Sequence, residues 1–287
     1  MAINLVTEYQ KKLAQHFSTG SKTDSYAGKS YDFVGVKSIE VFTIDDITLN
    51  NYTRSGTTRF GTTTEVEDTK QTLTMTQDRA FTKSIDKGNA NEQYNIKRAA
   101  EVLQMIDKRT IRPELDKYRL LKWATGNGLS DGKAVLTNAT AAALSKTNIL
   151  EAIFNASAAM SDKLVPMENR ALWISELDFV KFKLADVVVG GAQLNSDAIK
   201  RGFRGTIDSI SIVTVPSTYI PSNVGFIMKY KNATVDPVKL KTLRVHKDPM
   251  GVDGDVLEGR ILYDAFVLDA MCDGVYVYKT ASGAIGA

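Results

Sequence analysis

The residues best suited to catalysis are few in this chain of 287 residues. Histidine occurs only at His16, near the amino terminus, and at His246, in a charged strand end. A Ser-His-Asp arrangement needs a positioned base, and neither histidine lies in a pattern that supplies one. We therefore interpret both histidines as non-catalytic.

One glycine-rich stretch, GNGLSDGKA at 126–134, resembles a phosphate-binding loop. That motif requires Gly at its first position and Ser or Thr directly after its Lys. The chain has Asn127 and Ala134 at these two positions. We interpret the stretch as a solvent-exposed turn.

A second polar stretch, DPMGVDGDVLEG at 248–259, has carboxylates that suit a hard cation. They are Asp248, Asp253, Asp255 and Glu258. Their order relative to glycine does not match the calcium-loop pattern. The preferred interpretation is an acidic turn that joins two strands.

Three other residues with distinctive chemistry are interpreted as structural. Cys272 is the single cysteine, which excludes an internal disulfide and fits a reducing compartment. Its neighbours are apolar, so we expect a small core residue. Trp123 and Trp173 are expected to be core anchors. The sequence therefore predicts no enzyme, no cofactor and no metal site.

Composition is that of a globular protein with a sizeable core, at 43% hydrophobic and 24% charged residues. The net charge of +3 (36 basic minus 33 acidic residues) is too balanced for a surface that grips nucleic acid throughout. No apolar run approaches 18 residues and no signal-peptide pattern is visible, so we expect neither a membrane span nor export.

The strongest strand pattern is QTLTMTQDRAFTKSID at 71–86, where apolar and polar side chains alternate. As one strand it would be about 50 Å long, against about 17–20 Å for an ordinary strand. Four polar residues also dilute its apolar face. Together with the polar residues before it, we interpret 55–86 as a two-stranded excursion that another surface must support, because an isolated hairpin is marginal in water.

Helices and strands are expected on both sides of this excursion. Helical spacing predicts a long helix over 91–111, and Pro113 is expected to end it and begin a second one. Asn148 and Glu151 have capping-box spacing at the start of a helix, and Ser175 is expected to cap another. Further strands are expected at 36–44, 170–175, 207–215, 224–230 and 275–279.

Two segments lack such patterns. Residues 18–33 are rich in Ser, Gly and Lys, which predicts an arm that stays extended or disordered unless something outside holds it. Residues 190–205 form a long polar loop, of a kind that is usually functional.

Five stretches, in this order, are similar to major capsid proteins of tailed phages, particularly phages of Gram-positive bacteria. They are TMTQDRAFTKSIDKGNANEQ (74–93), RPELDKYRLLKWA (112–124), RGTIDSISIVTVPSTYIP (204–221), KNATVDPVKLKTLRV (231–245) and EGRILYDAFVLDAMCDGVYVYK (258–279). Each is weak alone, and their succession over most of the chain carries the resemblance. The junction DKGNANEQ departs from the family pattern because it is less acidic.

The resemblance implies an α+β chain with the Hong Kong ninety-seven (HK-ninety-seven) capsid fold, which has an N-terminal arm, an extended loop hairpin, a long spine helix, and peripheral and axial domains. The arm would be 1–35, and the peripheral strand with the extended loop 36–88. The spine helix with peripheral elements would be 89–134, and the axial domain with some peripheral elements 135–245. Residues 246–287 would return to the peripheral domain.

The same resemblance implies a structural protein that forms pentameric and hexameric capsomers of an icosahedral shell around a phage genome. The extended loop would lie on a neighbouring subunit, with apolar side chains buried and charged ones setting the register. The contact residues predicted on it are Arg59, Glu65, Glu67, Asp68, Lys70, Leu73, Met75, Arg79, Phe81, Lys83 and Ile85.

The expected partners are other copies of the chain, a separate scaffolding protein, a portal, and packaged double-stranded DNA held non-specifically. The expected location is the virion, after assembly in the host bacterial cytoplasm. Two alternatives stay open. One is an encapsulin-like nanocompartment shell protein, which shares the fold, and the other is a soluble binding protein that does not assemble.

Overall fold

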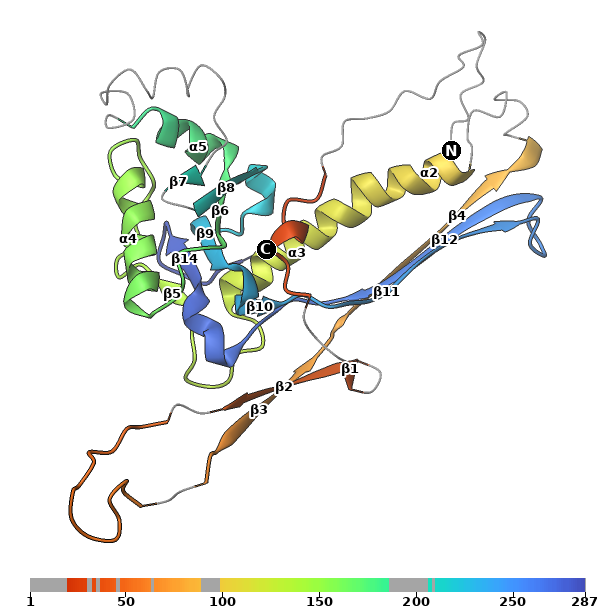
Figure 1. Ribbon diagram of the computed structural model, residues 1–287. Coiled ribbons are helices and arrows are strands. Elements are labelled where there is room, and N and C mark those ends of the chain that lie inside the picture. Colours follow the sequence, from red (N-terminus) through yellow and green to blue (C-terminus); the bar gives the residue numbers. More distant parts are fainter. Residues whose placement is uncertain are drawn as a thin grey trace.

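The computed structural model describes residues 20–29, 33–34, 37–44, 47–62, 65–88, 99–185, 206–207 and 210–286. His16, the start of the predicted helix at 91 and the polar loop at 190–205 lie outside the described residues. The described residues form three parts (Figure 1). The first is a sheet with helices on both faces, the second is a long helix that lies along a narrow sheet, and the third is a loop that projects away from both.

A six-stranded mixed sheet forms the largest domain. Its order is β5 (Leu136–Thr137), β14 (Val275–Lys279), β9 (Val224–Tyr230), β6 (Arg170–Ser175), β8 (Ile210–Val215) and β7 (Thr206–Ile207). Helices α4 (Ile149–Asp162) and α5 (Glu176–Lys183) cover one face, and helix α3 (Arg112–Thr125) covers the other. Every residue of β6 is buried because the strand is covered on both faces, as its continuous apolar run predicts.

The long helix does not end before Pro113, so that prediction is wrong. Helix α2 (Ala99–Ile106) continues through a π turn (Asp107–Ile111) into α3, which ends at the left-handed Gly126. Pro113 lies in the first turn of α3, and the wider π turn before it accommodates the missing N–H and the bulk of the ring. Asp107 in this turn pairs with Lys241 of β11 at 2.7 Å, which ties the helix to the neighbouring sheet.

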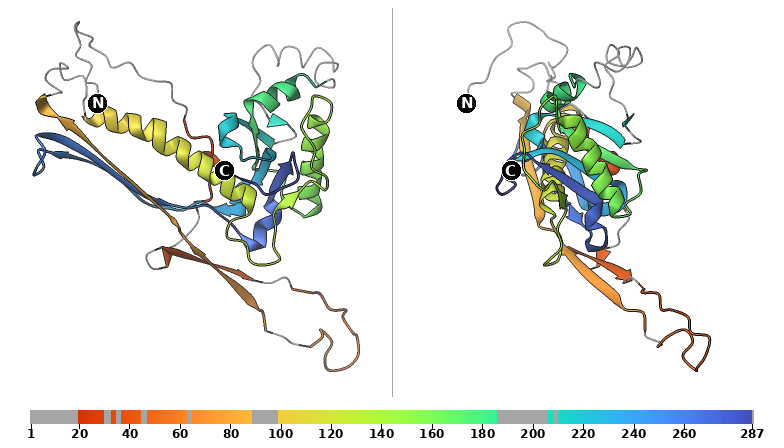
Figure 2. Two further views of the ribbon diagram at one scale, coloured as in Figure 1. Left: turned by 180° about the vertical axis from the view of Figure 1, so that it is seen from behind. Right: turned by 90° about the vertical axis from the view of Figure 1, so that its left-hand side faces the viewer.

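Beside this helix runs a narrow antiparallel sheet in the order β11 (Val238–Lys247), β12 (Gly254–Tyr263) and β4 (Gln77–Asp86) (Figure 2). A small core of Ile111, Ile261 and Tyr263, with Phe81 partly buried against it, joins sheet to helix. The turn between β11 and β12 contains the acidic residues near 250, as predicted, and it is held by ion pairs from Lys87 to Asp248 and Asp253.

Two smaller sheets complete the fold. One has the order β1 (Phe33–Val34), β2 (Ser38–Ile44) and β3 (Asp68–Thr74), and the other pairs β10 (Thr234–Val235) with β13 (Phe266–Val267). Short 3-10 helices lie at Asp24–Tyr26, Ser217–Tyr219, Lys231–Ala233 and Asp269–Gly274.

Of the two helix caps predicted from the sequence, one is present and one is not. Ser175 caps α5 by accepting a hydrogen bond from the Asp178 amide at 3.0 Å, which confirms that cap. Asn148 precedes α4 but does not cap it, because its Oδ1 accepts instead from the Ser145 amide. Strand β14 pairs with β5 and β9 in the six-stranded sheet, whereas β12, which also lies within 246–287, pairs with β4 in the narrow sheet.

The described part of the predicted arm, 20–29, is bound by other residues of the same chain, so it needs no second molecule to hold it. The carboxylate of buried Asp116 accepts hydrogen bonds from Ser21 Oγ, the Lys22 amide and Thr23 Oγ1 at 2.6–2.7 Å. Trp173 Nε1 donates to the carbonyl of Lys22 at 3.0 Å. A buried carboxylate needs such donors, so the segment 20–29 supplies hydrogen bonds that the buried Asp116 requires.

A second buried charge holds the far end of this segment. Lys229 is fully buried, and its Nζ donates to the carbonyl of Tyr26 at 2.7 Å and to Thr234 Oγ1 at 2.5 Å. The Asp236 carboxylate lies 3.6 Å away and the ring of Trp123 lies 3.8 Å away. Burial lowers the pKa of Lys229 to about 8, while the Asp236 charge opposes this shift.

This lowered pKa predicts a pH-dependent stability term. The ordinary pKa of 10.5 applies in the unfolded chain, so between pH 8 and 10.5 the unfolded chain binds more protons and the free energy of unfolding rises with pH. Denaturant titrations should show the wild-type value rising relative to Lys229→Met by up to about 1.4 kcal/mol per pH unit. A difference between the two proteins that is flat or falls with pH would contradict this assignment.

Candidate functional site

The described residues with distinctive chemistry make contacts within the fold. His246 pairs with Glu258 at 3.1 Å, and Trp123 and Trp173 are fully buried, 5.1 Å apart between ring centroids, which confirms them as core anchors. Cys272 is only partly buried, and desolvation raises its pKa, which disfavours the reactive thiolate. In the described ranges, no group of three or more His, Cys, Asp or Glu residues could hold a metal ion.

The turn at 126–133 is also structural, as predicted. Asn127 Nδ2 donates to the carbonyl of Ala265 at 2.8 Å, and the Asn127 carbonyl accepts from the Val267 amide. Ser130 Oγ donates to Asp269 at 2.5 Å. The turn thus packs onto β13 and the segment after it.

Among the residues that the structure describes, no helix is long and apolar enough to cross a membrane.

The feature that cannot be explained by the fold of one subunit is the projecting loop formed by β2, β3 and the chain between them (Figure 1). Large apolar side chains on it are exposed to solvent, from 55% for Tyr52 to 97% for Leu49. The seven are Phe42, Ile44, Ile47, Leu49, Tyr52, Phe60 and Val66. Large apolar side chains that are exposed in this number on one projecting loop make the loop the candidate interaction site.

The tip of the loop has its own internal structure. The Thr53 amide donates to the carbonyl of Arg59 at 3.0 Å, and the Gly61 amide donates to the carbonyl of Thr58 at 3.1 Å. The rings of Tyr52 and Phe60 meet edge to face at 5.1 Å between centroids. These contacts order the tip before any partner arrives, which reduces the entropy cost of binding.

The root of the loop is fixed in the core of its own subunit. Leu73 and Met75 are each 2% exposed and pack with Ile39, Leu262 and Phe266. These side chains therefore set the direction in which the loop leaves the subunit. Since they are already buried, they cannot also be buried by a neighbour.

The chain passes from one sheet to another directly after this root. Strand β3 pairs with β2, whereas β4, two residues later, pairs with β12. Buried Asp264 holds the junction, because its carboxylate accepts from the Thr76 amide at 2.8 Å, Thr76 Oγ1 at 3.0 Å and the Tyr118 hydroxyl at 2.9 Å. Burial raises the pKa of Tyr118, so its hydroxyl stays protonated and donates.

The predicted contact residues therefore fall into three groups. Arg59, Glu65, Glu67 and Asp68 are exposed on the projecting loop, and Lys70, also on it, pairs with Glu40 of the same subunit at 2.7 Å. Leu73 and Met75 form the buried root. Arg79, Phe81, Lys83 and Ile85 lie on β4 in the narrow sheet, so their assignment to the loop is wrong.

The residues on β4 contact their own subunit. Arg79 Nε binds Glu114 of α3 at 2.9 Å. The Phe81 ring lies against Gly259 of β12, where an added Cβ would approach the ring to 2.2 Å. Phe81 thus belongs to the joint between sheet and helix, and Phe81→Asp would damage the fold rather than assembly alone.

The predicted contact set contains none of the seven exposed apolar side chains. Phe42 and Ile44 belong to β2, and Ile47, Leu49 and Tyr52 follow it. A signal was present, because β2 carries apolar residues on both of its faces and bulky apolar residues continue into the polar stretch beyond it.

Neither family models nor curated proteins match this chain at the level of sequence. Solved structures do match over nearly its whole length. A structure from Mycobacterium phage Che8 covers 98% of this chain and 99% of its own, with TM-score 0.69 and 14% identity. The capsid structure of cyanophage P-SCSP1u covers 97% and 93%, with TM-score 0.70 and 14% identity.

The mature capsid of bacteriophage PhiM1 is similar as well, with TM-score 0.67 and 12% identity over 96% of this chain and 91% of its own. The chain has the HK-ninety-seven capsid fold. A virus-like particle from Pyrococcus furiosus matches at a lower TM-score of 0.54, with 12% identity over 89% of this chain and 90% of its own. In this fold, the helix over α2 and α3 corresponds to the spine helix and the projecting loop to the extended loop.

The Asp264 junction generates a prediction. Asp264→Ala leaves the Thr76 amide and the Tyr118 hydroxyl without their acceptor, so we expect a loss of about 3 kcal/mol in the free energy of unfolding. Amide hydrogen exchange should accelerate at 72–76. Asp131→Ala, in the exposed turn, is the matched control and should change neither value. Slow exchange at 72–76 in the Asp264 variant would show that the root is held by other contacts.

Proposed function

We propose that this chain is the major capsid protein of a tailed phage. It assembles through its projecting loop into pentameric and hexameric capsomers, and these form the icosahedral shell that encloses the genome. The single observation that supports this most directly is a loop with a rigid root, an ordered tip and seven exposed apolar side chains, on a chain with a capsid fold. Its role is structural and not enzymatic.

The energetics of the loop favour assembly. Burying one of the seven side chains contributes about 1.5 kcal/mol before ordering costs are subtracted. The ordering costs are reduced because root and tip are already structured. A contact between the loop of one subunit and another surface of the next is heterologous, and such contacts close into rings when the rotation allows.

The domain arrangement follows the sheets. The peripheral domain would be the spine helix with the narrow sheet, including β4, β11 and β12. The axial domain would be the six-stranded sheet with α4 and α5, and it would include β14 from the end of the chain. Only this last strand changes the boundaries expected from sequence.

The partners and location are part of the same proposal. The chain would bind other copies of itself, a separate scaffolding protein and a portal, and would enclose double-stranded DNA without base-specific contacts. It would assemble in the host bacterial cytoplasm and end in the virion.

The similarity to the virus-like particle keeps an encapsulin-like compartment as a second candidate. Its lower TM-score favours the phage capsid. Neighbouring genes separate the two, since terminase and portal genes would support a phage and a gene for an enzyme cargo would support a compartment.

Electron microscopy of the purified chain tests the proposal, and closed shells, tubes or capsomers are expected.

The variant Leu49→Ser/Phe60→Ser removes two exposed apolar side chains from the loop. It should keep its circular dichroism spectrum and thermal midpoint but elute as a monomer in size-exclusion chromatography.

Leu164→Ser is a matched control, since Leu164 is 91% exposed but lies beyond α4 in the other domain. It should assemble at the wild-type level. A wild-type chain that stays monomeric under all conditions would refute the capsid proposal and favour a non-assembling binding protein.

A further inference from the structure

The segment 20–29, here called the strap, has contacts that suit a part that can dock and be released. Among its residues Thr23 and Ala27 are buried, and Ala27 is its one buried apolar side chain. Three charged interior side chains bind it, namely Asp116, Lys229 and Asp236. Water would solvate these charges if the strap left, so release costs less free energy than exposing an apolar surface of the same size.

The last part of the strap binds next to the root of the projecting loop. The Gly28 amide donates to Asp236 Oδ2 at 2.9 Å, and the Asp236 amide donates to the Gly28 carbonyl at 3.0 Å. Val235, the preceding residue in the chain, is buried and packs in the same cluster as Leu73 and Met75. The strap therefore holds the residue beside one of the root side chains.

Val235 belongs to a strand that is too short to be stable through its own ladder. Strand β10 has two residues, and its pairs with β13 are Thr234 with Val267 and Val235 with Phe266. Phe266 also packs in the root. Because a two-residue ladder contributes little, the hydrogen bonds from the strap to Asp236 help to position both root side chains.

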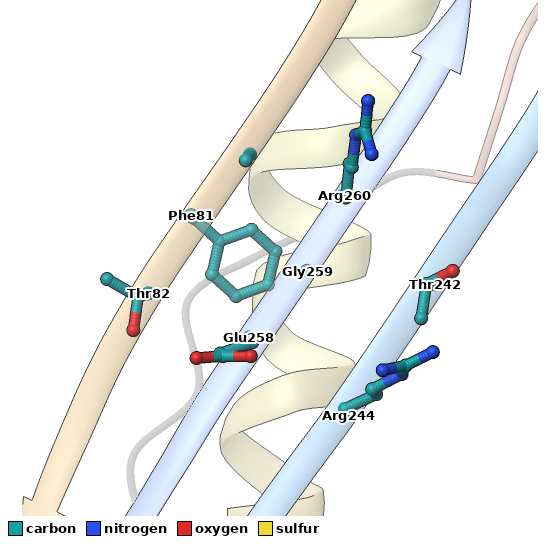
Figure 3. Close-up of a pocket in the computed structure, with 8 residues that line it drawn as sticks. Phe81, Thr82, Thr242, Arg244, Glu258, Gly259 and Arg260 are labelled. Atoms are coloured by element: carbon teal, nitrogen blue, oxygen red, sulfur yellow. The ribbon is translucent and has the colours of Figure 1, made fainter.

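On its other side, the root continues into a support that does not involve the strap. All ten residues of β4 pair with β12. The Phe81 ring is directed across β12 at Gly259 (Figure 3). We therefore expect the narrow sheet to keep its structure whether or not the strap is docked.

Docking in the observed position requires glycine at residue 28. A Cβ at Gly28 would overlap the carbonyl group of Thr234, which is backbone of β10 and cannot turn aside as a flexible side chain could. A Cβ at Gly20, at the other end of the strap, would meet no other group of the described residues within 4 Å. The two glycines thus allow the same substitution with and without a clash.

We propose that the docked strap is a latch for assembly. Through Asp236 and Val235 it fixes the direction in which the projecting loop leaves the subunit, and a subunit with a released strap does not hold its loop ready for assembly. The consequence for shells rests on the proposed function. The coupling between strap and root is a property of the single subunit and can be measured without shells.

Gly28→Ala should release the strap while leaving the loop sequence unchanged. In hydrogen exchange of the unassembled subunit, amides at 22–28 and at 72–75 should exchange about tenfold faster or more, because one opening exposes both. Amides of β4 should stay as slow as in the wild type. The protein concentration needed for shell formation should rise about tenfold or more, since fewer subunits are competent.

Gly20→Ala is the matched control and should change none of these values. Faster exchange at 22–28 with unchanged exchange at 72–75 would overturn the coupling. Faster exchange at both places with shell formation at the wild-type concentration would overturn the latch.

A milder variant keeps the test valid if Gly28→Ala does not fold. Thr23→Val removes a hydroxyl that donates to Asp116 at 2.6 Å, at the end of the strap remote from Asp236. Exchange should accelerate by the same factor at 22–28 and at 72–75, and unequal factors would overturn the coupling. A wild-type chain that forms no shells would overturn the proposed function instead, and the exchange data would distinguish this outcome because they do not depend on shells.

Discussion

The structure depends on how one extended segment, 68–86, is divided between two sheets. Residues before Met75 pair with β2, and residues after Thr76 pair with β12. The Asp264 carboxylate makes this division possible, because it satisfies the Thr76 amide at the point where the backbone leaves one ladder and enters the other. Without that acceptor, the Thr76 amide would lose its hydrogen bond at the junction, and the projecting loop would lose its fixed direction.

A second set of buried charges makes the rest of the subunit a rigid base for the loop. Asp116 and Lys229 bind the backbone of the segment 20–29 from α3 and β9. Each charge is buried, so each requires these partners to avoid a large desolvation cost. The amino-terminal segment is thereby part of the core, and the spine helix, the six-stranded sheet and this segment hold one another in place. A rigid base suits a protein whose proposed function is to repeat one contact many times in a closed shell.

Much of the fold was predictable because local patterns agree with burial. The apolar run at 170–175 became the doubly covered strand β6, and Ser175 capped the helix that follows. The order of short similar stretches also indicated the right fold. Predictions failed where one local pattern of apolar and polar residues is compatible with two different tertiary structures. Alternation continues unbroken across Met75 and Thr76, so it cannot show where one sheet ends and another begins.

The sequence by itself determined which segments are extended and which are helical, apart from the continuity of the long helix through Pro113, and it predicted no catalytic chemistry. Only the tertiary structure decided which of the apolar side chains on the extended segments are buried and which are exposed. Leu73 and Phe42 are both apolar residues in neighbouring strands, yet one is 2% and the other 63% exposed. The physical reason is that burial depends on contacts with residues distant in sequence, such as Leu262 and Phe266, and alternation along one strand carries no information about those partners.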